Sequence, residues 1–161
     1  MHRESILEGY EDLKKETGLL KASVRKYRKK PYEVGKIYTP NELESYDALS
    51  FRFMKNVDLI LSFFRSIEKY LDAKESETLR DRLLFIQKLN IVHDIDFWFE
   101  ARELRGKFAH TYLPSKLKDI YTEIIVKSNV VFDCERKLGK YLKKIAQKHE
   151  PMLFNNFKVQ R

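Results

Sequence analysis

The sequence predicts an all-α protein, an up-and-down antiparallel bundle of four to five helices. Only five glycines and four prolines stand against 35% charged residues, so the chain lacks the turns that a many-stranded sandwich or barrel requires. Apolar residues recur every three to four positions over long stretches, which is the period of an amphipathic helix. The connections expected between these stretches are short, and short connections favour antiparallel neighbours.

The length of the chain suits a single domain. With 161 residues, of which 43% are hydrophobic, it is long enough to fill one core. We expect one domain over 1–161, with an N-terminal helix and basic arm in 1–40, a bundle in 41–148 and a tail in 149–161. The tail carries apolar residues that would be able to dock on the bundle, namely Met152, Leu153, Phe154 and Phe157.

The first element is predicted to be a short helix that breaks near Gly18. Its apolar face consists of Ile6, Tyr10, Leu13 and Leu20. The segment 21–30 that follows is rich in lysine and arginine, contains no acid, and includes Tyr27. An irregular connector is then marked by Pro31, Gly35 and Pro40. We interpret 21–30 as a linker or an arm.

The strongest periodic pattern begins at Asn41 and predicts a long amphipathic helix, with Thr39 or Asn41 as its cap. Its apolar stripe is Leu49, Phe53, Val57, Ile60, Leu61, Phe64, Ile67 and Leu71. A shorter helix is predicted from about Ser76, with Thr78 near its start. The apolar face of this helix is Leu79, Leu83, Ile86 and Leu89.

Two further helices complete the predicted bundle. One begins near Asp94, and we expect Pro114 to stop it, because proline breaks a helix interior. Its apolar residues are Phe97, Trp98, Ala101, Leu104 and Phe108. The last helix is predicted from about Ser115 to Lys148. Its inward residues are Leu117, Ile120, Tyr121, Ile124, Val131, Leu138, Tyr141 and Ile145.

The charge of the chain bears on its partners. A formal net charge of +8 attracts any polyanion through counterion release, which favours RNA, DNA or another nucleotide-bearing partner. A well-solvated surface explains the same charge equally well. The basic segment 21–30 has the same two interpretations: it fits a nucleic-acid backbone with a base stacked on Tyr27, or it is a solvated arm.

Cysteine usage and hydropathy bear on the compartment. The single cysteine, Cys134, excludes an intrachain disulfide and a thiol metal site, which suits a reducing compartment. The first residues are charged and lack the apolar core of a signal peptide, and no stretch approaches the ~18 apolar residues that span a bilayer. We expect a cytoplasmic protein without a membrane association.

No pattern in the sequence indicates a metal or a cofactor. The histidines His2, His93, His110 and His149 are dispersed, and none has the spacing of a metal pair. The carboxylates of Asp94 and Asp96 stand at a helix start, where acids satisfy free backbone amides, and we interpret them as caps. The glycines never form a phosphate-binding loop. Most of the aromatic side chains at 97–99 are expected to pack in the core.

The strongest candidate site is the end of the third bundle helix. It concentrates the polar residues Arg102, Arg105, Lys107, His110 and Tyr112 on an otherwise apolar helix. A guanidinium suits bidentate phosphate binding and an imidazole titrates near neutral pH, so the pair can cleave a phosphodiester without a metal. RNA supplies its own nucleophile, the 2′-hydroxyl. The alternative is a surface or hydrogen-bonded core histidine with no catalytic role.

Helical geometry constrains this site. At ~100° per residue, Arg105 and Tyr112 lie within about 20° of each other, whereas Arg105 and His110 are about 140° apart. Either the helix bends or ends between them, or a second copy of the chain completes the site across a two-fold axis. Gly106 is costly inside a helix and would permit a bend or a close helix approach. This geometry favours a dimer.

The segment from Arg105 to Tyr112, preceded by Trp98, resembles the R-x4-H-x-Y signature of HEPN domains, specifically the HepT toxins and the related nucleotidyltransferase substrate-binding proteins. The similarity extends over about 46–145, and it implies a HEPN-like bundle in 41–148. The resemblance implies a homodimeric, metal-independent endoribonuclease whose two motifs meet in a cleft. It also implies that Arg105 binds the scissile phosphate, that His110 is the general acid or base, and that neither metal nor cofactor is needed.

The resemblance further implies a partner, a small MntA-like nucleotidyltransferase antitoxin that in some pairs attaches AMP to the motif tyrosine, here Tyr112. Arg102, Gly106 and Lys107 are supporting or RNA-binding candidates. The family usually has a polar residue, most often asparagine, directly after the arginine, and this chain has Gly106. A HepT-like toxin is the leading hypothesis. The alternatives are a non-catalytic HEPN module that docks a nucleotidyltransferase and presents its substrate, and a helical interaction protein without nucleotide chemistry.

Overall fold

A computed structural model describes the backbone of residues 3–71 and 75–156 and the side chains of residues 5–71 and 75–147. Over these residues the protein is all-α, as predicted, and no strand occurs in the described ranges. The helices are α1 (Arg3–Lys29), α2 (Pro40–Tyr70), α3 (Leu79–Lys88), α4 (Asp96–Ala109) and α5 (Pro114–Asn156).

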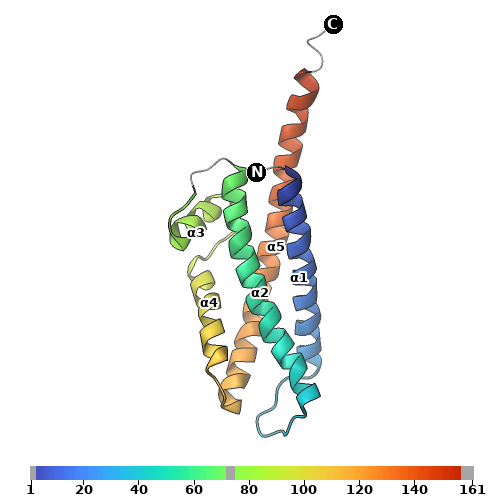
Figure 1. Ribbon diagram of the computed structural model, residues 1–161, viewed down its shortest axis with the longest axis vertical. Coiled ribbons are helices and arrows are strands. Elements are labelled where there is room, and N and C mark those ends of the chain that lie inside the picture. Colours follow the sequence, from blue (N-terminus) through green and yellow to red (C-terminus); the bar gives the residue numbers. More distant parts are fainter. Residues whose placement is uncertain (1–2, 72–74, 157–161) are drawn as a thin grey trace.

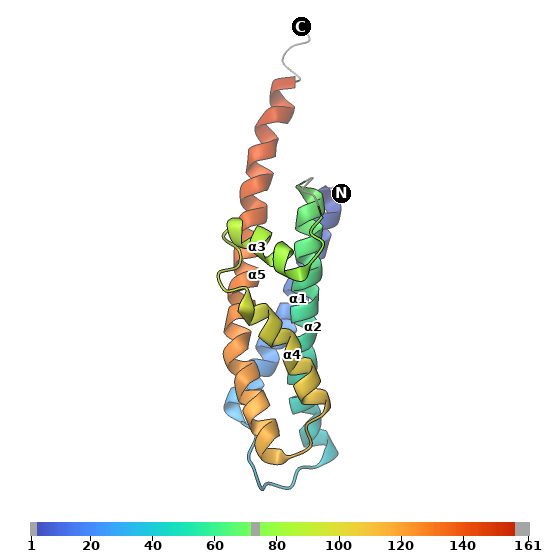
Figure 2. The ribbon, with the colours of Figure 1, turned by 90° about the vertical axis from the view of Figure 1, so that its left-hand side faces the viewer.

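The helices form an up-and-down bundle (Figure 1). α1, α2, α4 and α5 alternate in direction, while the short α3 lies across the bundle and packs against α2 (Figure 2). α2 packs against both α1 and α4, and α5 packs against α1, α2 and α4, whereas no close contact joins α1 to α4 within the described ranges. The predicted antiparallel arrangement is therefore confirmed, and α1 and α4 lie on opposite sides of the bundle.

One hydrophobic cluster fills the space between the helices. The stripe predicted for α2 supplies much of it, and Phe53, Ile60 and Phe64 are completely buried. Trp98 of α4 is 1% exposed and packs edge-on between Phe64 and Phe97, with ring centroids 5.4 and 5.2 Å away. These aromatic residues are core residues, as predicted, and they fix α4 against α2.

The predicted caps are present at the helix starts. Thr39 begins α2 with a capping box, in which its hydroxyl accepts from the amide of Glu42 and its own amide donates to the Glu42 carboxylate at 3.0 Å. Thr78 caps α3 with its hydroxyl. The Asp94 carboxylate accepts from the first two backbone amides of α4. A side-chain cap of this kind contributes about 1 kcal/mol.

The structure corrects the prediction of a short N-terminal helix followed by an arm. α1 runs without a break through Gly18, and its last turns include most of the basic segment 21–30. Val24 is 2% exposed and continues the buried stripe of α1, so the basic residues occupy the outer face of a packed helix. A glycine in a helix costs about 1 kcal/mol, which the apolar burial on either side outweighs. The predicted irregular connector follows α1.

The prediction that Pro114 stops the third bundle helix was wrong. α4 ends at Ala109, and Pro114 is the first residue of α5. A proline is well placed there, because the first amides of a helix have no partner within it and the fixed φ of proline suits a helix start.

The last helix is longer than predicted. α5 continues past Lys148 to Asn156 and projects beyond the ends of the other helices (Figure 1). Apolar periodicity reflects packing partners, so it fades where a helix leaves its bundle. The docking predicted for Met152, Leu153, Phe154 and Phe157 falls outside the described side chains.

Candidate functional site

The end of α4 is anchored on one face and exposed on the other. Leu104 is completely buried, and the half-buried Phe108 packs on the ring of Tyr121 of α5 with centroids 6.3 Å apart. Between these anchors, Arg105, Gly106 and Lys107 are exposed. The apolar residues of the motif therefore fix the helix, and its polar residues face solvent.

Arg105 lies at the junction of α4 and α2. Its guanidinium Nη1 donates to Oδ2 of Asp58 at 3.3 Å, while the two side chains stay 72% and 56% exposed. Arg102 and Arg105 share a small hollow of about 120 Å³ with Asp58 and neighbouring apolar residues. A single contact to Asp58 leaves most of the Arg105 donors available to an anion such as phosphate.

His110 follows the last residue of α4, and its side chain is exposed. The helix therefore ends between Arg105 and His110, which is one of the arrangements expected from the helical angles. Tyr112 is 84% exposed and lies outside the helix, so its predicted alignment with Arg105 on one helical face was wrong. The segment between α4 and α5 lies at the same end of the bundle as the connector between α1 and α2 (Figure 2).

The described chain does not join Arg105 to His110. No hydrogen bond, ion pair or shared hollow links the two side chains within residues 5–71 and 75–147. In the same residues, the side chains of His110 and Tyr112 make no hydrogen bond to the protein. One copy therefore presents a guanidinium and an imidazole as separate exposed groups.

Gly106 has space around it. A Cβ built on Gly106 would meet nothing within 4 Å, so packing within this chain does not require a glycine. The close helix approach that we considered for this position does not occur inside one copy.

An apolar groove lies beside Arg105 on the face of α2. It has a volume of about 410 Å³ and is bounded by Phe51, Met54, Leu59 and Arg105 among others. The Phe51 ring is 65% exposed. This groove was not predicted from the sequence. The one available signal was Phe51, a large apolar residue that lies outside the predicted buried stripe of α2 and therefore had to face solvent or a partner.

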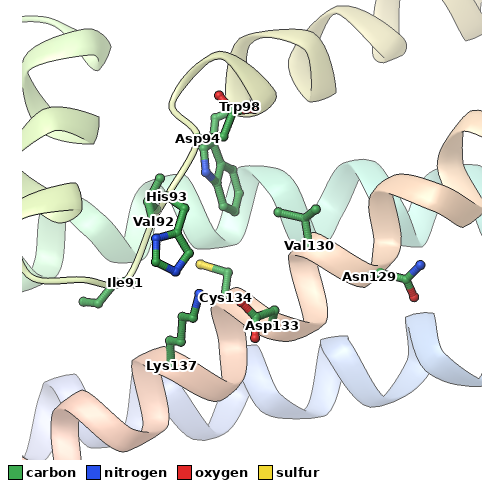
Figure 3. A pocket seen from close by; sticks show the side chains of 10 residues that line it. All are labelled: Ile91, Val92, His93, Asp94, Trp98, Asn129, Val130, Asp133, Cys134 and Lys137. Carbon is green, nitrogen blue, oxygen red and sulfur yellow. Dashed lines mark ion pairs between the residues drawn. The ribbon is translucent and has the colours of Figure 1, made fainter.

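A second hollow, of about 310 Å³, lies between the segment before α4 and α5. Figure 3 shows the imidazole of His93, the sulfur of Cys134 and the amino group of Lys137 facing this space. Burial raises the pKa of the Cys134 thiol well above its usual range, so the sulfur stays protonated and is a poor nucleophile. Lys137 is already paired with Asp133 at 2.6 Å. The thiol in this hollow is therefore not activated, and its lysine is held in an ion pair.

No group of three or more histidine, cysteine, aspartate or glutamate side chains is placed to hold a metal ion in the part of the chain that the structure describes. Within that part, none of the helices combines the length and the apolar character needed to span a membrane. Comparison of the chain with family models, with curated proteins and with solved structures gives no match.

Proposed function

We propose that this protein is a HepT-like, metal-independent endoribonuclease that acts as a homodimer. The observation that carries the proposal is the end of α4 at Ala109. It leaves Arg105 exposed near the end of the helix and His110 exposed directly after it, while apolar residues anchor the helix. A cation and an imidazole without a metal are the groups that transesterification of RNA needs.

In the proposed reaction, Arg105 binds the non-bridging oxygens of the scissile phosphate and stabilises the charge that develops on them. The His110 imidazole of the second copy takes the proton from the ribose 2′-hydroxyl as the 2′-oxygen attacks phosphorus. The bond from phosphorus to the 5′-oxygen breaks, and the imidazolium just formed gives its proton to that oxygen. The products are a 2′,3′-cyclic phosphate and a 5′-hydroxyl, so no metal or water enters this step.

The proposed dimer explains the separation of the two groups. Exposed Phe51 and half-buried Met54 and Leu59 border Arg105 on the open face of α2. A second copy placed on this face would bury these apolar side chains and bring a second motif to the first. The open space at Gly106 is compatible with such an approach.

Tyr112 is the proposed acceptor for AMP from an MntA-like nucleotidyltransferase antitoxin. Its 84% exposed side chain lies in the short segment between two helices, where an enzyme can reach it. The phenol oxygen would attack the α-phosphorus of ATP, losing its proton as pyrophosphate leaves. The phosphate of the adduct would add negative charge beside a phosphate-binding site and exclude RNA.

A non-catalytic docking module is the second candidate. It is favoured by Gly106, which puts no polar side chain after the arginine and leaves open space there. In that case the exposed end of α4 would present a substrate to the nucleotidyltransferase rather than cleave RNA.

Cleavage of varied RNAs in the presence of a chelator separates the two candidates. We expect the purified wild-type chain to cleave RNA in excess EDTA, and His110→Ala and Arg105→Ala to lose at least about a hundredfold in rate. Lys88→Ala, an exposed change on α3, is the matched control and should cleave like the wild type. If the wild type leaves every RNA intact, the docking module is the better account.

A further inference from the structure

A second charged feature lies on the side of the bundle away from Arg105, where α1 and α5 pack side by side (Figure 1). The hydroxyl of Tyr10 on α1 occupies the space beside Gly139 of α5, where a Cβ would collide with it. A groove of about 620 Å³ opens along this contact. Its cations come from both helices and are Lys14, Lys21, Arg136, Lys140 and Lys143.

The acids of this α1/α5 groove are already engaged. Glu11 pairs with Lys14 at 3.7 Å, and Asp133 pairs with Arg136 and Lys137. The largely buried Glu135 accepts a hydrogen bond from the Tyr10 hydroxyl at 2.7 Å and lies 3.8 Å from the Lys21 ammonium. The three acids therefore offset only three of the five cations, and the groove keeps a net positive charge.

Two of the cations are uncommitted within the described residues. Lys140 and Lys143 are exposed on successive turns of α5 and form no ion pair with any described side chain. The half-buried ring of Phe132 also lines the groove, and the Lys21 ammonium lies 5.4 Å from its centroid. A cationic groove that is partly lined by apolar side chains complements a ribose-phosphate chain, whose phosphates are charged.

The positive surface continues along α1. Arg25, Lys26 and Lys29 surround a shallow hollow on the outer face of its last turns, where the sequence had indicated a basic segment. At 1.5 Å per residue, the distance from Lys14 to Lys29 along the helix is about 22 Å. The cations thus form a track along one helix rather than a single point.

We propose that the α1/α5 groove binds the phosphate backbone of single-stranded RNA. The proposal rests on the proposed function only in taking RNA as the substrate. Because α1 and α4 lie on opposite sides of the bundle, the groove is separate from Arg105 and anchors the strand at a distance from the bond that is cleaved. Backbone contacts of this kind carry affinity and little sequence preference.

The test measures RNA binding as a function of salt. The full chain carrying His110→Ala, which keeps the RNA intact, is titrated against a fluorescein-labelled single-stranded RNA by fluorescence anisotropy across a KCl series. The groove variant adds Lys140→Glu and Lys143→Glu. The control variant adds Lys69→Glu and Lys88→Glu, which make the same change in net charge at exposed positions on α2 and α3.

We expect the groove variant to bind RNA more weakly and to reduce the slope of log K against log salt by about 1.4, the value for two lost contacts to single-stranded phosphates. The control variant should keep the parental slope. Equal slopes of log K against log salt in the groove and control variants would overturn the proposal. A protein partner would then be the better candidate for the occupant of the groove.

This readout is independent of cleavage. If the wild type fails to cut RNA while the groove variant alone loses RNA binding, the proposed function fails and the groove proposal stands. If the wild type cuts RNA in EDTA and both variants bind with the parental slope, the groove proposal fails and the ribonuclease stands.

Discussion

Arg105 and Asp58 form an ion pair that joins α4 to α2, with 3.3 Å between Nη1 and Oδ2. Both side chains are more than half exposed, so the pair contributes little to the stability of the fold. Its larger effect is on the proposed chemistry, because the Asp58 carboxylate occupies one side of the guanidinium that would bind a phosphate. In the proposed function, Asp58 would therefore compete with RNA for Arg105.

Asp58→Asn should strengthen RNA binding at the proposed site. Loss of the competing carboxylate is expected to lower the KM for RNA by about two- to fivefold, the effect of an exposed ion pair of about 0.5–1 kcal/mol. Steady-state cleavage at low salt measures it. Asp119→Asn, at an exposed position on α5, is the matched control for the change in charge. If the KM of Asp58→Asn is not lower than that of this control, Asp58 does not compete with RNA for Arg105.

Gly106→Asn should increase the rate of cleavage. The open space around Gly106 accommodates a side chain, and an amide there would supply the polar group that HEPN motifs usually have. A hydrogen bond to a charged phosphate suggests a gain of about tenfold. Gly106→Ala is the control that adds the Cβ without the amide, and equal rates in the two variants would show that the amide has no role.

Gly139→Ala and Gly18→Ala should have opposite effects on stability. At Gly139 a Cβ collides with Tyr10, whose hydroxyl donates to Glu135, so we expect a loss of about 1–3 kcal/mol from overpacking. At Gly18 a Cβ meets nothing within 4 Å, and the change should stabilise α1 by up to about 1 kcal/mol. Urea unfolding monitored by circular dichroism measures both, and a destabilising Gly18→Ala would contradict the continuous helix.

Glu42 makes the start of α2 sensitive to acid. Its hydrogen bond with the Thr39 amide, together with Lys36 and Lys30, lowers its pKa from 4.5 to about 2. A lowered pKa in the folded state means that the stabilisation is complete above pH 4.5 and is lost as the pH falls towards 2. The free energy of unfolding should therefore fall over this range less steeply in Glu42→Gln than in the wild type. Identical pH profiles would show that the capping box does not depend on this charge.

Much of the fold could be predicted because it depends on local pattern. The stripe of α2 and the caps at Thr39 and Thr78 were visible as spacing and residue type. Helix ends were less accessible, because a proline such as Pro114 can end one helix or begin the next, and only the packed structure decides. Gly18 likewise suggested a helix break from its residue type alone. The helix continues through it because the burial of the other apolar residues of α1 outweighs the cost of one glycine.

The candidate site could be predicted only in part. The residue types at Arg105 and His110 indicated phosphate chemistry, but the partner of Arg105 is Asp58, which is 47 positions away and carries no local signal. Phe51 and the α1/α5 groove likewise depend on which helices become neighbours. A contact between two elements is a property of packing, and periodicity alone does not specify it.

In the proposed dimer, Arg105 of one copy acts with His110 of the other. Arg105→Ala and His110→Ala proteins should each be nearly inactive alone. When the two are mixed and allowed to exchange subunits, each mixed dimer contains one intact Arg105 and one intact His110 in opposite copies, so RNA cleavage in EDTA should reappear. If the wild type cleaves RNA but the mixture stays as inactive as either variant, the two residues act within a single copy and the shared site is wrong.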